Sequence, residues 1–578
     1  MTKLKLFNNS IFSVLFLAFI IGTLYFQTTK YGYTALDDYD LIKKKISFLS
    51  NWNNLPIIFR TTLFQSEGTV YFRPIVTLSF MIDVLLFKGF VFGFHFSSLV
   101  YHFIATCLIY FGLNKILNSH WFALALSSIF AVHSLNVQAI SWIPGRNDIL
   151  LLIFMLLTLH FFIKTNYSEQ IVKTLFYSFL FFLFFFLGLL TKENFLIIIL
   201  MFLVFSVVNK KNIKSKIPLV LLFSGMVILV IIYFKLRQNA INSSLQYEVF
   251  NLKVKDYLIG ILSYTSKIFF PLDLNVLSLA ESVNLVYVGF GILIFVIFLS
   301  FGIKDIKIFT ISIGFYFLFL ISGMVGTTGF ANFLEHRAYV PLVFMLLVMG
   351  QLKLFDRLNQ SQIFILFTFL FFTFSIISFN YSNNFKDELT FWREAVRKNS
   401  NSYFAHRGLA NTYHYKNMFE QAEREYLKSL ELNPKSLETI INLATNYKKL
   451  EKFENAEELF KKSLRINNNP IIYNNFGNLL LAMGKNEEAI QYFQKAIQLK
   501  PNYFEAYSNL GVAYAKLSQA SLAKEYFLKS IQINPFFAEG HYNLAIAFSS
   551  LNKLDSAQIH LNEAQKLGIK ISVNNKAN

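Results

Sequence analysis

Two adjacent carboxylates stand in the stretch YTALDDYDLIKKK at residues 33–45, directly after an apolar run. A carboxylate within hydrogen-bond reach of a hydroxyl can accept its proton, so Asp37 and Asp38 are candidates for a general acid or base. Asp also favours the first turn of a helix, and one of the two could cap the short helix that YDLIKKKISFL indicates. Capping needs only one carboxylate. Because the two residues are adjacent, their positions in the sequence do not show which one caps the helix and which one could act as the acid or base.

Further ionisable residues stand at the ends of apolar runs. Ionisable groups near the hydrocarbon of a membrane are costly, and they tend to be paired or functional. Cations hold anionic groups by charge-assisted hydrogen bonds, and four could do so here: Arg73, Arg146, Lys192 and Arg337. Five neighbours are candidates for supporting roles: His133, Asp148, Glu193, Glu335 and His336. Several cations together with several carboxylates suit an anionic substrate plus an acid or base.

Each of these residues also has a structural explanation. Arg146 and Lys192 could be interfacial anchors, Arg337 could pair with Glu335, and His133 could be a satisfied side chain at the end of a span. His95 and His102, seven residues apart, could share a helix face, but no third metal ligand accompanies them. We therefore expect them to pack in the core, and no metal site is predicted.

The composition is that of a membrane protein. Of the 578 residues, 54% are hydrophobic and 69 are Phe, with a mean hydropathy of +0.46, whereas soluble chains are less apolar. The one cysteine, Cys107, excludes a disulfide framework. Many lysines and arginines lie in short loops between apolar runs, where they set topology, so the formal charge of +19 does not indicate a nucleic-acid partner.

The apolar runs predict a polytopic bundle in residues 1–380. The basic start MTKLKLFNN places the amino terminus in the cytoplasm, and residues 28–92 then form an outer loop. No small-residue cleavage site follows the first run, so we count it as a span. Eleven spans are predicted, at about 10–27, 93–113, 120–135, 147–164, 173–190, 194–209, 217–235, 283–302, 308–325, 338–354 and 361–379. The run at 256–274 is expected to be interfacial or re-entrant, since a further span would reverse the charge bias of the later loops.

Residues 403–569 form an internal repeat with spacings of 34, 33, 34 and 34 residues. Each unit has the order of aromatic and small residues found in the tetratricopeptide repeat. The fourth unit shows it as Tyr507, Leu510, Gly511, Tyr514, Ala523, Phe527, Ser530 and Pro535. We expect five repeats, preceded by a half-repeat connector at 384–402 and followed by a tail at 570–578. Such solenoids bind peptides or helices and carry no chemistry, so any catalysis belongs to the membrane half.

The order of the polar motifs resembles membrane glycosyltransferases of the GT-C fold. The chain is similar to the transmembrane and tetratricopeptide repeat (TMTC) protein O-mannosyltransferases and their bacterial relatives. The resemblance is carried by DD at 37–38, YFRPIVTLSF at 71–80, HSLNVQAISWIPGRNDILL, LLTKEN and EHRAYVP, with the repeats after them. Two departures are visible, because the family usually has Pro where this chain has Ser134 and Glu where it has Gln138. They weaken any role for the turn at His133.

This resemblance implies an integral membrane enzyme that moves a mannose-like sugar from a polyprenyl-phosphate carrier to an acceptor hydroxyl, expected on protein Ser or Thr. Asp38 is then the expected base, with Asp37 its close rival. Arg73, Arg146, Lys192 and Arg337 would hold the donor phosphate. RPIVTLSFMIDVLLF would be a helix of the outer loop lying along the membrane surface. No nucleotide cofactor is expected, and the sequence leaves a divalent cation open.

The predicted partners are the lipid-linked sugar, the membrane and an acceptor protein recruited by the repeats. The expected location is a bacterial inner membrane, or the endoplasmic reticulum of a eukaryote, with the repeats periplasmic or lumenal. One alternative is a membrane-anchored repeat scaffold without catalysis. A transporter or flippase ranks lowest, because few ionisable residues stand in the middle of the spans apart from Asp83.

Overall fold

The computed structural model describes residues 2–34, 37–63, 71–208, 216–241, 254–277, 284–324, 334–567 and 569. Regular structure in these residues is helical, apart from an isolated bridge between Ile303 and Leu352. The chain divides into two compact units, Met1–Asn399 and Ser400–Asn578. The all-α fold class is confirmed. The tail at 570–578 and the span ends at residues 209, 283 and 325 lie outside the described residues.

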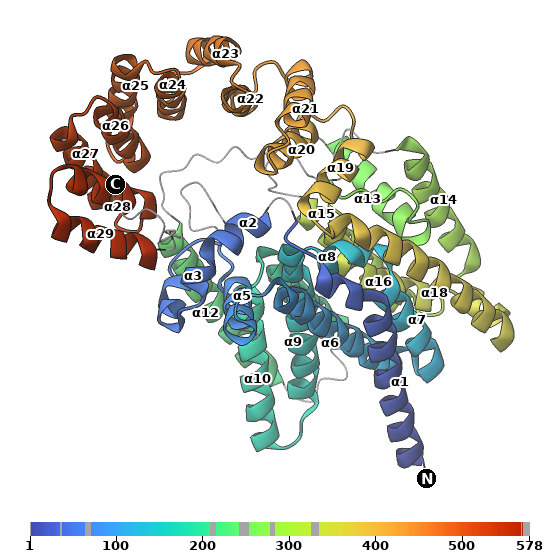
Figure 1. Ribbon diagram of the computed structural model, residues 1–578. Coiled ribbons are helices and arrows are strands. Elements are labelled where there is room, and N and C mark those ends of the chain that lie inside the picture. The colour runs from blue at the N-terminus through green and yellow to red at the C-terminus, as the bar shows by residue number, and fades with distance from the viewer. Residues whose placement is uncertain are drawn as a thin grey trace. The chain divides into compact units, whose positions relative to one another are not determined.

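The first unit is a bundle of long apolar helices joined by short ones (Figure 1). Its helices are α1 (Thr2–Tyr25), α2 (Asp37–Leu41), α3 (Ile46–Leu49), α4 (Leu55–Ile58), α5 (Pro74–Phe87), α6 (Val91–Leu117), α7 (His120–Val132), α8 (Val137–Ser141), α9 (Arg146–Tyr167), α10 (Ile171–Leu189), α11 (Ile197–Val208), α12 (Lys216–Ala240), α13 (Val254–Phe269), α14 (Leu285–Phe301), α15 (Ile306–Met324), α16 (Tyr339–Gly350), α17 (Leu354–Arg357), α18 (Gln360–Ser382) and α19 (Glu388–Lys398).

Seven helical segments of the described residues are long and apolar enough to cross a membrane. They are Ser10–Lys30, Val91–Leu117, Ile143–Tyr167, Ile171–Leu189, Pro218–Ala240, Ile306–Met324 and Gln360–Phe385. The predicted span at 120–135 falls on α7 and α8, which are bent by 47° relative to one another. The predicted spans at 194–209, 283–302 and 338–354 correspond to shorter helices of 12 to 17 residues. In the described residues, seven segments have the length and hydropathy of a full span, or eight if the bent pair is counted as one, where eleven spans were expected.

The polar stretch around α8 forms the centre of this unit. Every residue from 131 to 150 is buried, although the stretch contains Asn, Gln, Arg and Asp. The chain leaves α7 at His133, which is extended with ψ of 130° and so ends the helix. Only glycine fits at position 145, because a Cβ there would lie 2.8 Å from Ala139 Cα and from the Gln138 carbonyl oxygen. This close approach fixes the start of α9 against α8.

The candidate residues lie at the ends of elements rather than within them. Asp37 begins α2, and Arg73 directly precedes α5, which starts with Pro74 at a position where proline is favoured. Lys192 follows α10, and a short 3-10 turn, Glu335–Ala338, leads into α16. Helix ends leave backbone groups and side chains free to face a common space, so these positions suit a site.

The second unit consists of five antiparallel helix pairs that follow one another along a curved solenoid (Figure 1). Its helices are α20 (Tyr403–Tyr415), α21 (Phe419–Leu432), α22 (Leu437–Lys449), α23 (Phe453–Ile466), α24 (Pro470–Ala482), α25 (Asn486–Leu499), α26 (Phe504–Lys516), α27 (Ala520–Ile533), α28 (Ala538–Ser550) and α29 (Leu554–Lys566). The segment predicted as a half-repeat contains α19, which belongs to the first unit.

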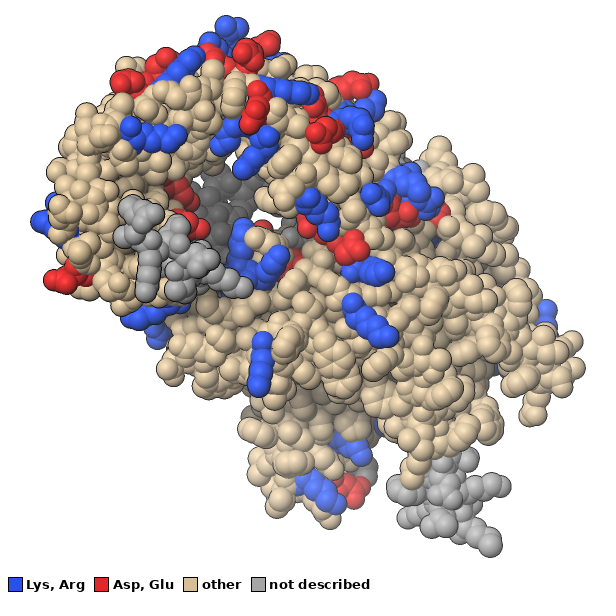
Figure 2. Space-filling view, viewed as in Figure 1, with Lys and Arg blue, Asp and Glu red and all other residues tan. Residues whose placement is uncertain are grey.

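Small residues allow the two helices of a repeat to approach closely. A Cβ on Gly511 of α26 would lie 2.7 Å from the ring of Phe527 on α27, and Gly477 meets Phe493 in the same way at 2.6 Å. Both phenylalanines are buried in the repeat core. Charged side chains cover the outside of the repeats, whereas the visible face of the first unit has large uncharged areas (Figure 2).

A methyl group added at Gly511 should therefore destabilise the repeats. We expect Gly511→Ala to lower the free energy of unfolding by about 1–3 kcal/mol, the usual range for overpacking a core. Thermal or denaturant unfolding of the full chain measures the change. Ser521→Ala, on the exposed surface of α27, is the control and should leave stability within about 0.5 kcal/mol. Equal stability of the two variants would contradict this account of the glycine.

Candidate functional site

Asp38 is fully buried at the start of α2. Its Oδ2 accepts hydrogen bonds from the backbone nitrogen and the hydroxyl of Thr34, at 2.7 and 2.8 Å. Its other oxygen, Oδ1, is buried with no hydrogen-bond partner among the described residues. Burial raises the pKa of Asp38 to about 8, and neighbouring Asp37 adds to the rise, although the two hydrogen bonds oppose it. Asp38 is therefore largely protonated at neutral pH.

Asp37 has a different environment. It is only half-buried, and no side-chain hydrogen bond joins it to another described residue. Burial raises its pKa to about 6, and the positive charge of Arg73 limits the rise. At neutral pH Asp37 is therefore mostly ionised and reachable, whereas its neighbour is neutral and enclosed. This difference is invisible in the spacing of the sequence.

Two ion pairs lie side by side, because Lys192 and Glu193 are adjacent in the chain. Arg73 donates to Glu193 at 2.9 Å, and Lys192 donates to Asp148 at 2.6 Å. Burial would raise the pKa of Glu193, but Arg73 holds it below its usual range. The face of Tyr71 lies 4.6 Å from the Arg73 guanidinium, which adds a cation–π contact.

The turn at Glu335–Ala338 adds two further residues to this cluster. Arg337 lies within electrostatic range of Arg73 and Asp148, and Lys192 lies within range of Arg337. His336 Nε2 is 3.8 Å from Asp148 Oδ2. Burial, together with the nearby Lys192 and Arg337 charges, holds the pKa of His336 well below its usual range, so the imidazole is neutral. The structure thus gathers three cations, three carboxylates and a neutral histidine, with Asp38 beside them.

Arg146, which the sequence predicts as a donor-binding residue, makes its hydrogen bonds with residues outside this cluster, although it lies within electrostatic range of Asp38. It is completely buried, and its Nη1 donates to Asp83 at 2.5 Å and to Ser79 at 3.3 Å. Its Nη2 donates to the carbonyl oxygen of Phe94 at 2.5 Å. These contacts tie α9 to α5 and α6, so the guanidinium is committed to protein partners. The geometry favours a structural role for Arg146, which fixes the helix that follows Arg73.

Glu335 is also held by the protein rather than pointed at the cluster. It is fully buried, and its Oε1 accepts from Lys267 at 2.8 Å and from the backbone nitrogen of Asn275 at 3.2 Å. Lys267 is thus its buried ion-pair partner. Asn275 is itself held by a reciprocal amide pair with Asn399, at 3.0 and 3.2 Å.

His133 and Gln138 support the same turn. Gln138 accepts from the backbone nitrogen of His336 at 3.0 Å and donates to the carbonyl oxygen of Val276 at 3.1 Å. His133 Nε2 lies 2.8 Å from the carbonyl oxygen of Ile268. The glutamine that departs from the family pattern thus makes hydrogen bonds with both of its functional groups. Gln138 thus contacts the cluster through His336, whose Nδ1 lies 3.2 Å from Gln138 Oε1, whereas the hydrogen bonds of His133 go to backbone groups.

Sequence reasoning missed several residues of this arrangement. Asp83 is the single charge of α5, and Lys267 lies in the otherwise uncharged second half of α13; each is half of a buried ion pair. A lone charge in an apolar run was a usable signal, since such a group needs a partner. Asn275 and Asn399 carried no signal, because their pairing depends on the fold.

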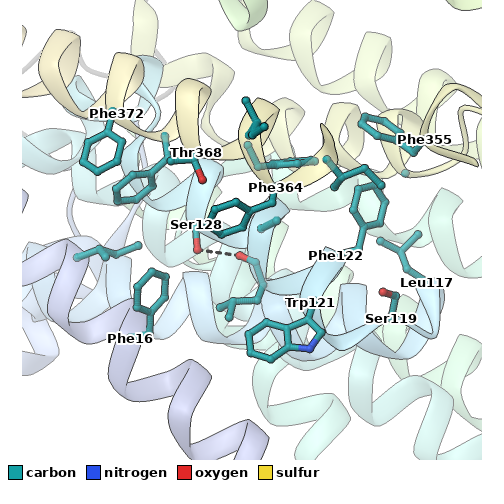
Figure 3. A pocket seen from close by; sticks show the side chains of 18 of the residues that line it. Phe16, Leu117, Ser119, Trp121, Phe122, Ser128, Phe355, Phe364, Thr368 and Phe372 are labelled. Carbon is teal, nitrogen blue, oxygen red and sulfur yellow. Dashed lines mark hydrogen bonds between the residues drawn. The ribbon is translucent and has the colours of Figure 1, made fainter. Parts of the chain in front are cut away.

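A cavity of about 1810 Å³ lies between α1, α7 and α18. Figure 3 shows aromatic side chains along it, including Phe16, Trp121, Phe364 and Phe372, and the hydroxyl of Ser128, which donates to the Leu124 carbonyl oxygen. None of the predicted site residues lines this cavity. Among the described residues, no three His, Cys, Asp or Glu side chains are grouped to hold a metal ion. His102 instead contacts Tyr339 and the Ala131 carbonyl oxygen.

Breaking the Arg146–Asp83 pair should destabilise the first unit. Asp83→Leu leaves a buried, uncompensated guanidinium, and we expect a loss of about 3–5 kcal/mol in the free energy of unfolding. The double variant Asp83→Leu/Arg146→Leu should recover most of this loss. Asp356→Leu removes half of an exposed pair with Lys304 and should change stability by less than about 1 kcal/mol. Denaturation of the detergent-solubilised chain measures the stability of all three variants. If the double variant lost as much stability as the two single substitutions added together, the structural role of the pair would be contradicted.

The raised pKa of Asp38 predicts a pH-dependent stability. A carboxyl whose pKa is higher in the folded state stabilises the fold at low pH, and this contribution is lost as pH rises through about 8. Asp38→Asn mimics the neutral acid at every pH. We expect the variant to gain several kcal/mol relative to the wild type between pH 4 and pH 8, at about 1.4 kcal/mol per pKa unit. If the stabilities of the wild type and Asp38→Asn changed with pH in parallel, the pKa of Asp38 would not be raised in the folded protein.

Comparison with known proteins finds matches in both sequence and structure. Residues 477–518 match the family model described as TPR repeat, and residues 408–436, 437–470 and 504–537 match tetratricopeptide repeat. The protein O-mannosyl-transferase Tmtc2 of Drosophila melanogaster is 28% identical over 163 residues, which cover 27% of this chain and 17% of that protein. A protein O-mannosyl-transferase of Caenorhabditis elegans is 31% identical over 107 residues, covering 18% of this chain and 15% of that protein.

Among solved structures, the crystal structure of MamA is 26% identical and covers 28% of this chain and 94% of that chain, with a TM-score of 0.24. The aligned segments span less than a fifth of the length of the two curated relatives. The chain is therefore similar in sequence to TMTC protein O-mannosyl-transferases and contains tetratricopeptide repeats.

Proposed function

We propose that the chain is a membrane glycosyltransferase that transfers a mannose-like sugar from a polyprenyl-phosphate carrier to a hydroxyl of a protein acceptor. The observation that carries this proposal is an ionised, half-buried Asp37 within electrostatic range of Arg73, which itself lies within range of Lys192 and Arg337. A proton acceptor beside a cationic cluster is what the transfer of a sugar away from a phosphate requires. The similarity to O-mannosyl-transferases supports the choice of sugar.

The reaction assigns a task to each kind of group. The acceptor oxygen attacks the anomeric carbon and forms the new glycosidic bond, while the bond from that carbon to the phosphate oxygen breaks. The acceptor proton passes to the carboxylate of Asp37. The departing phosphate carries the negative charge, which Arg73, Lys192 and Arg337 stabilise by charge-assisted hydrogen bonds.

The protonation states favour Asp37 over Asp38 as the proton acceptor. Asp38 is enclosed and largely neutral, and its Oδ2 is occupied by Thr34. Asp37 is reachable and ionises near pH 6. We therefore reverse the sequence-based preference and assign Asp38 the task of holding its neighbour in place through the turn at Thr34.

Unpaired buried oxygens offer places for the sugar. Glu193 Oε1 and Asp148 Oδ2 have no hydrogen-bond partner among the described residues, although both are buried. A buried acceptor without a partner is costly, and sugar hydroxyls would supply the missing donors. The two ion pairs would then orient the donor sugar as well as its phosphate.

The repeats complete the proposal. Tetratricopeptide solenoids bind extended segments or helices, and a repeat array on the same chain raises the effective concentration of its bound acceptor. The positive-inside pattern of the loops supports an outer location for the repeats and the charge cluster. The alternative, a non-catalytic scaffold, does not explain why cations and carboxylates are gathered in the interior of the first unit.

Two substitutions test the assignment of the base. Asp37→Asn should lower kcat/KM for transfer from a polyprenyl-phosphate mannose donor by about 10²–10⁴-fold, the usual share of general base catalysis. Asp38→Asn, which resembles the neutral acid, should stay within about tenfold of the wild type. Asp40→Asn is the matched control, because Asp40 lies in the same helix but is exposed. For the wild type, kcat/KM should rise with pH through about 6, where Asp37 loses its proton.

The opposite ranking, with Asp38→Asn inactive and Asp37→Asn active, would make Asp38 the base. Full activity of both variants would exclude the pair from proton transfer. Folding is checked on each variant by its unfolding temperature, so that a loss of activity is not confused with a loss of structure.

A further inference from the structure

Three hydrogen-bond donors beside the Arg73–Glu193 ion pair are buried and have no partner in the part of the chain that the structure describes. They are Nε of Arg73, the hydroxyl of Tyr233 and Nε of Arg237. Tyr233 is only 1% exposed. A buried donor without an acceptor costs free energy, and each one calls for an explanation such as a ligand. Three of them together indicate an acceptor-rich, negatively charged ligand.

These three donors lie close to one another. Tyr233 and Arg237 are four residues apart on α12, so their side chains lie on the same face of that helix. The ring of Tyr233 is 6.2 Å from the ring of Phe72, the residue before Arg73. Tyr233 is also within electrostatic range of Glu193, Arg237 and Arg73. The end of α12 therefore borders the ion pair that Arg73 forms with Glu193.

Arg237 does not behave as an ordinary interfacial anchor. An anchor extends its charged group into water or among lipid head groups. Arg237 is half-buried with its Nε enclosed, whereas Lys235, two residues earlier on the same helix, is exposed. The helix thus carries one cation suited to anchoring and another directed toward the cluster.

We propose that Tyr233 and Arg237 form, together with Arg73, a subsite for a phosphate group that is attached to a long apolar chain. Phosphate oxygens accept from arginine and from a tyrosine hydroxyl, so one anion would satisfy all three donors. The neighbouring face of α12 exposes Val227, Ile231 and Phe234, an apolar surface suited to the chain below the phosphate. This inference rests on the proposed function in naming the lipid-linked donor as the ligand.

A binding experiment tests the subsite without measuring catalysis. The full chain in detergent is titrated with farnesyl phosphate, inorganic phosphate and farnesol. Arg237→Gln should weaken the affinity for farnesyl phosphate by about tenfold, the effect of losing one charge-assisted hydrogen bond, and Tyr233→Phe by a few-fold. Lys235→Gln is the matched control and should stay within about twofold. Farnesol binding should be the same in every variant.

Unchanged farnesyl phosphate affinity in both Arg237→Gln and Tyr233→Phe would overturn the proposal. An equal loss in the Lys235→Gln control would overturn it as well, because the effect would then be one of general charge. If inorganic phosphate bound as tightly as farnesyl phosphate, with the same dependence on Arg237, the assignment to a lipid-linked phosphate would be wrong.

Folding provides a second measurement. The Tyr233 hydroxyl has no described protein partner, so its removal in Tyr233→Phe should not lower the unfolding temperature of the ligand-free protein. The stabilisation that farnesyl phosphate gives should nevertheless shrink. A destabilised ligand-free variant would show a structural role for the hydroxyl and overturn the proposal.

The outcome is separable from that of the proposed function. In Asp37→Asn, which should lose sugar transfer, the binding of farnesyl phosphate should still depend on Arg237 and Tyr233, because Asp37 is assigned to the acceptor proton. If no sugar transfer were detected but binding still depended on Arg237 and Tyr233, the proposed function would fail and the subsite would stand.

Discussion

The buried ion pair between Arg146 and Asp83 is the contact on which the rest of the first unit depends. It joins α9, at the centre of the bundle, to α5, which begins directly after Arg73. Taking a guanidinium and a carboxylate out of water is costly, and only close pairing with further hydrogen bonds offsets that cost. Because the pair tolerates little displacement, the position of Arg73 beside Glu193 follows from it.

The same desolvation sets the chemistry of the cluster. Asp37 and Asp38 are neighbours of identical type, yet their pKa values differ because Asp38 is fully enclosed whereas Asp37 is less buried and lies near the positive charge of Arg73. Burial among cations holds His336 neutral, so its imidazole can donate or accept a hydrogen bond without adding a positive charge to the cluster. Burial thus turns a set of ordinary ionisable residues into groups with separate tasks.

The sequence predicted the kinds of element well and their lengths less well. Apolar runs indicated the membrane helices, and the spacing of Gly477, Gly511 and their aromatic partners indicated the repeats, because both patterns follow from local geometry. The span at 120–135 was not foreseen as a bent pair, since the break at His133 is stabilised by Ile268, far away in the sequence. Likewise, the motif order selected Asp37, Arg73 and Lys192 for the site. It could not show that Arg146 is committed to Asp83, because the partner of a buried charge is a property of the fold.

The hydrogen bonds of Asn399 determine which part of the first unit bears force applied to its end. This residue ends the unit, and the next residue begins the repeat unit. Asn399 donates hydrogen bonds to Asn275 and to the carbonyl oxygen of Leu277. The same loop, residues 275–277, also hydrogen-bonds Glu335 and Gln138. Tension applied along the chain at this junction is therefore borne first by the loop beneath His336 and Arg337.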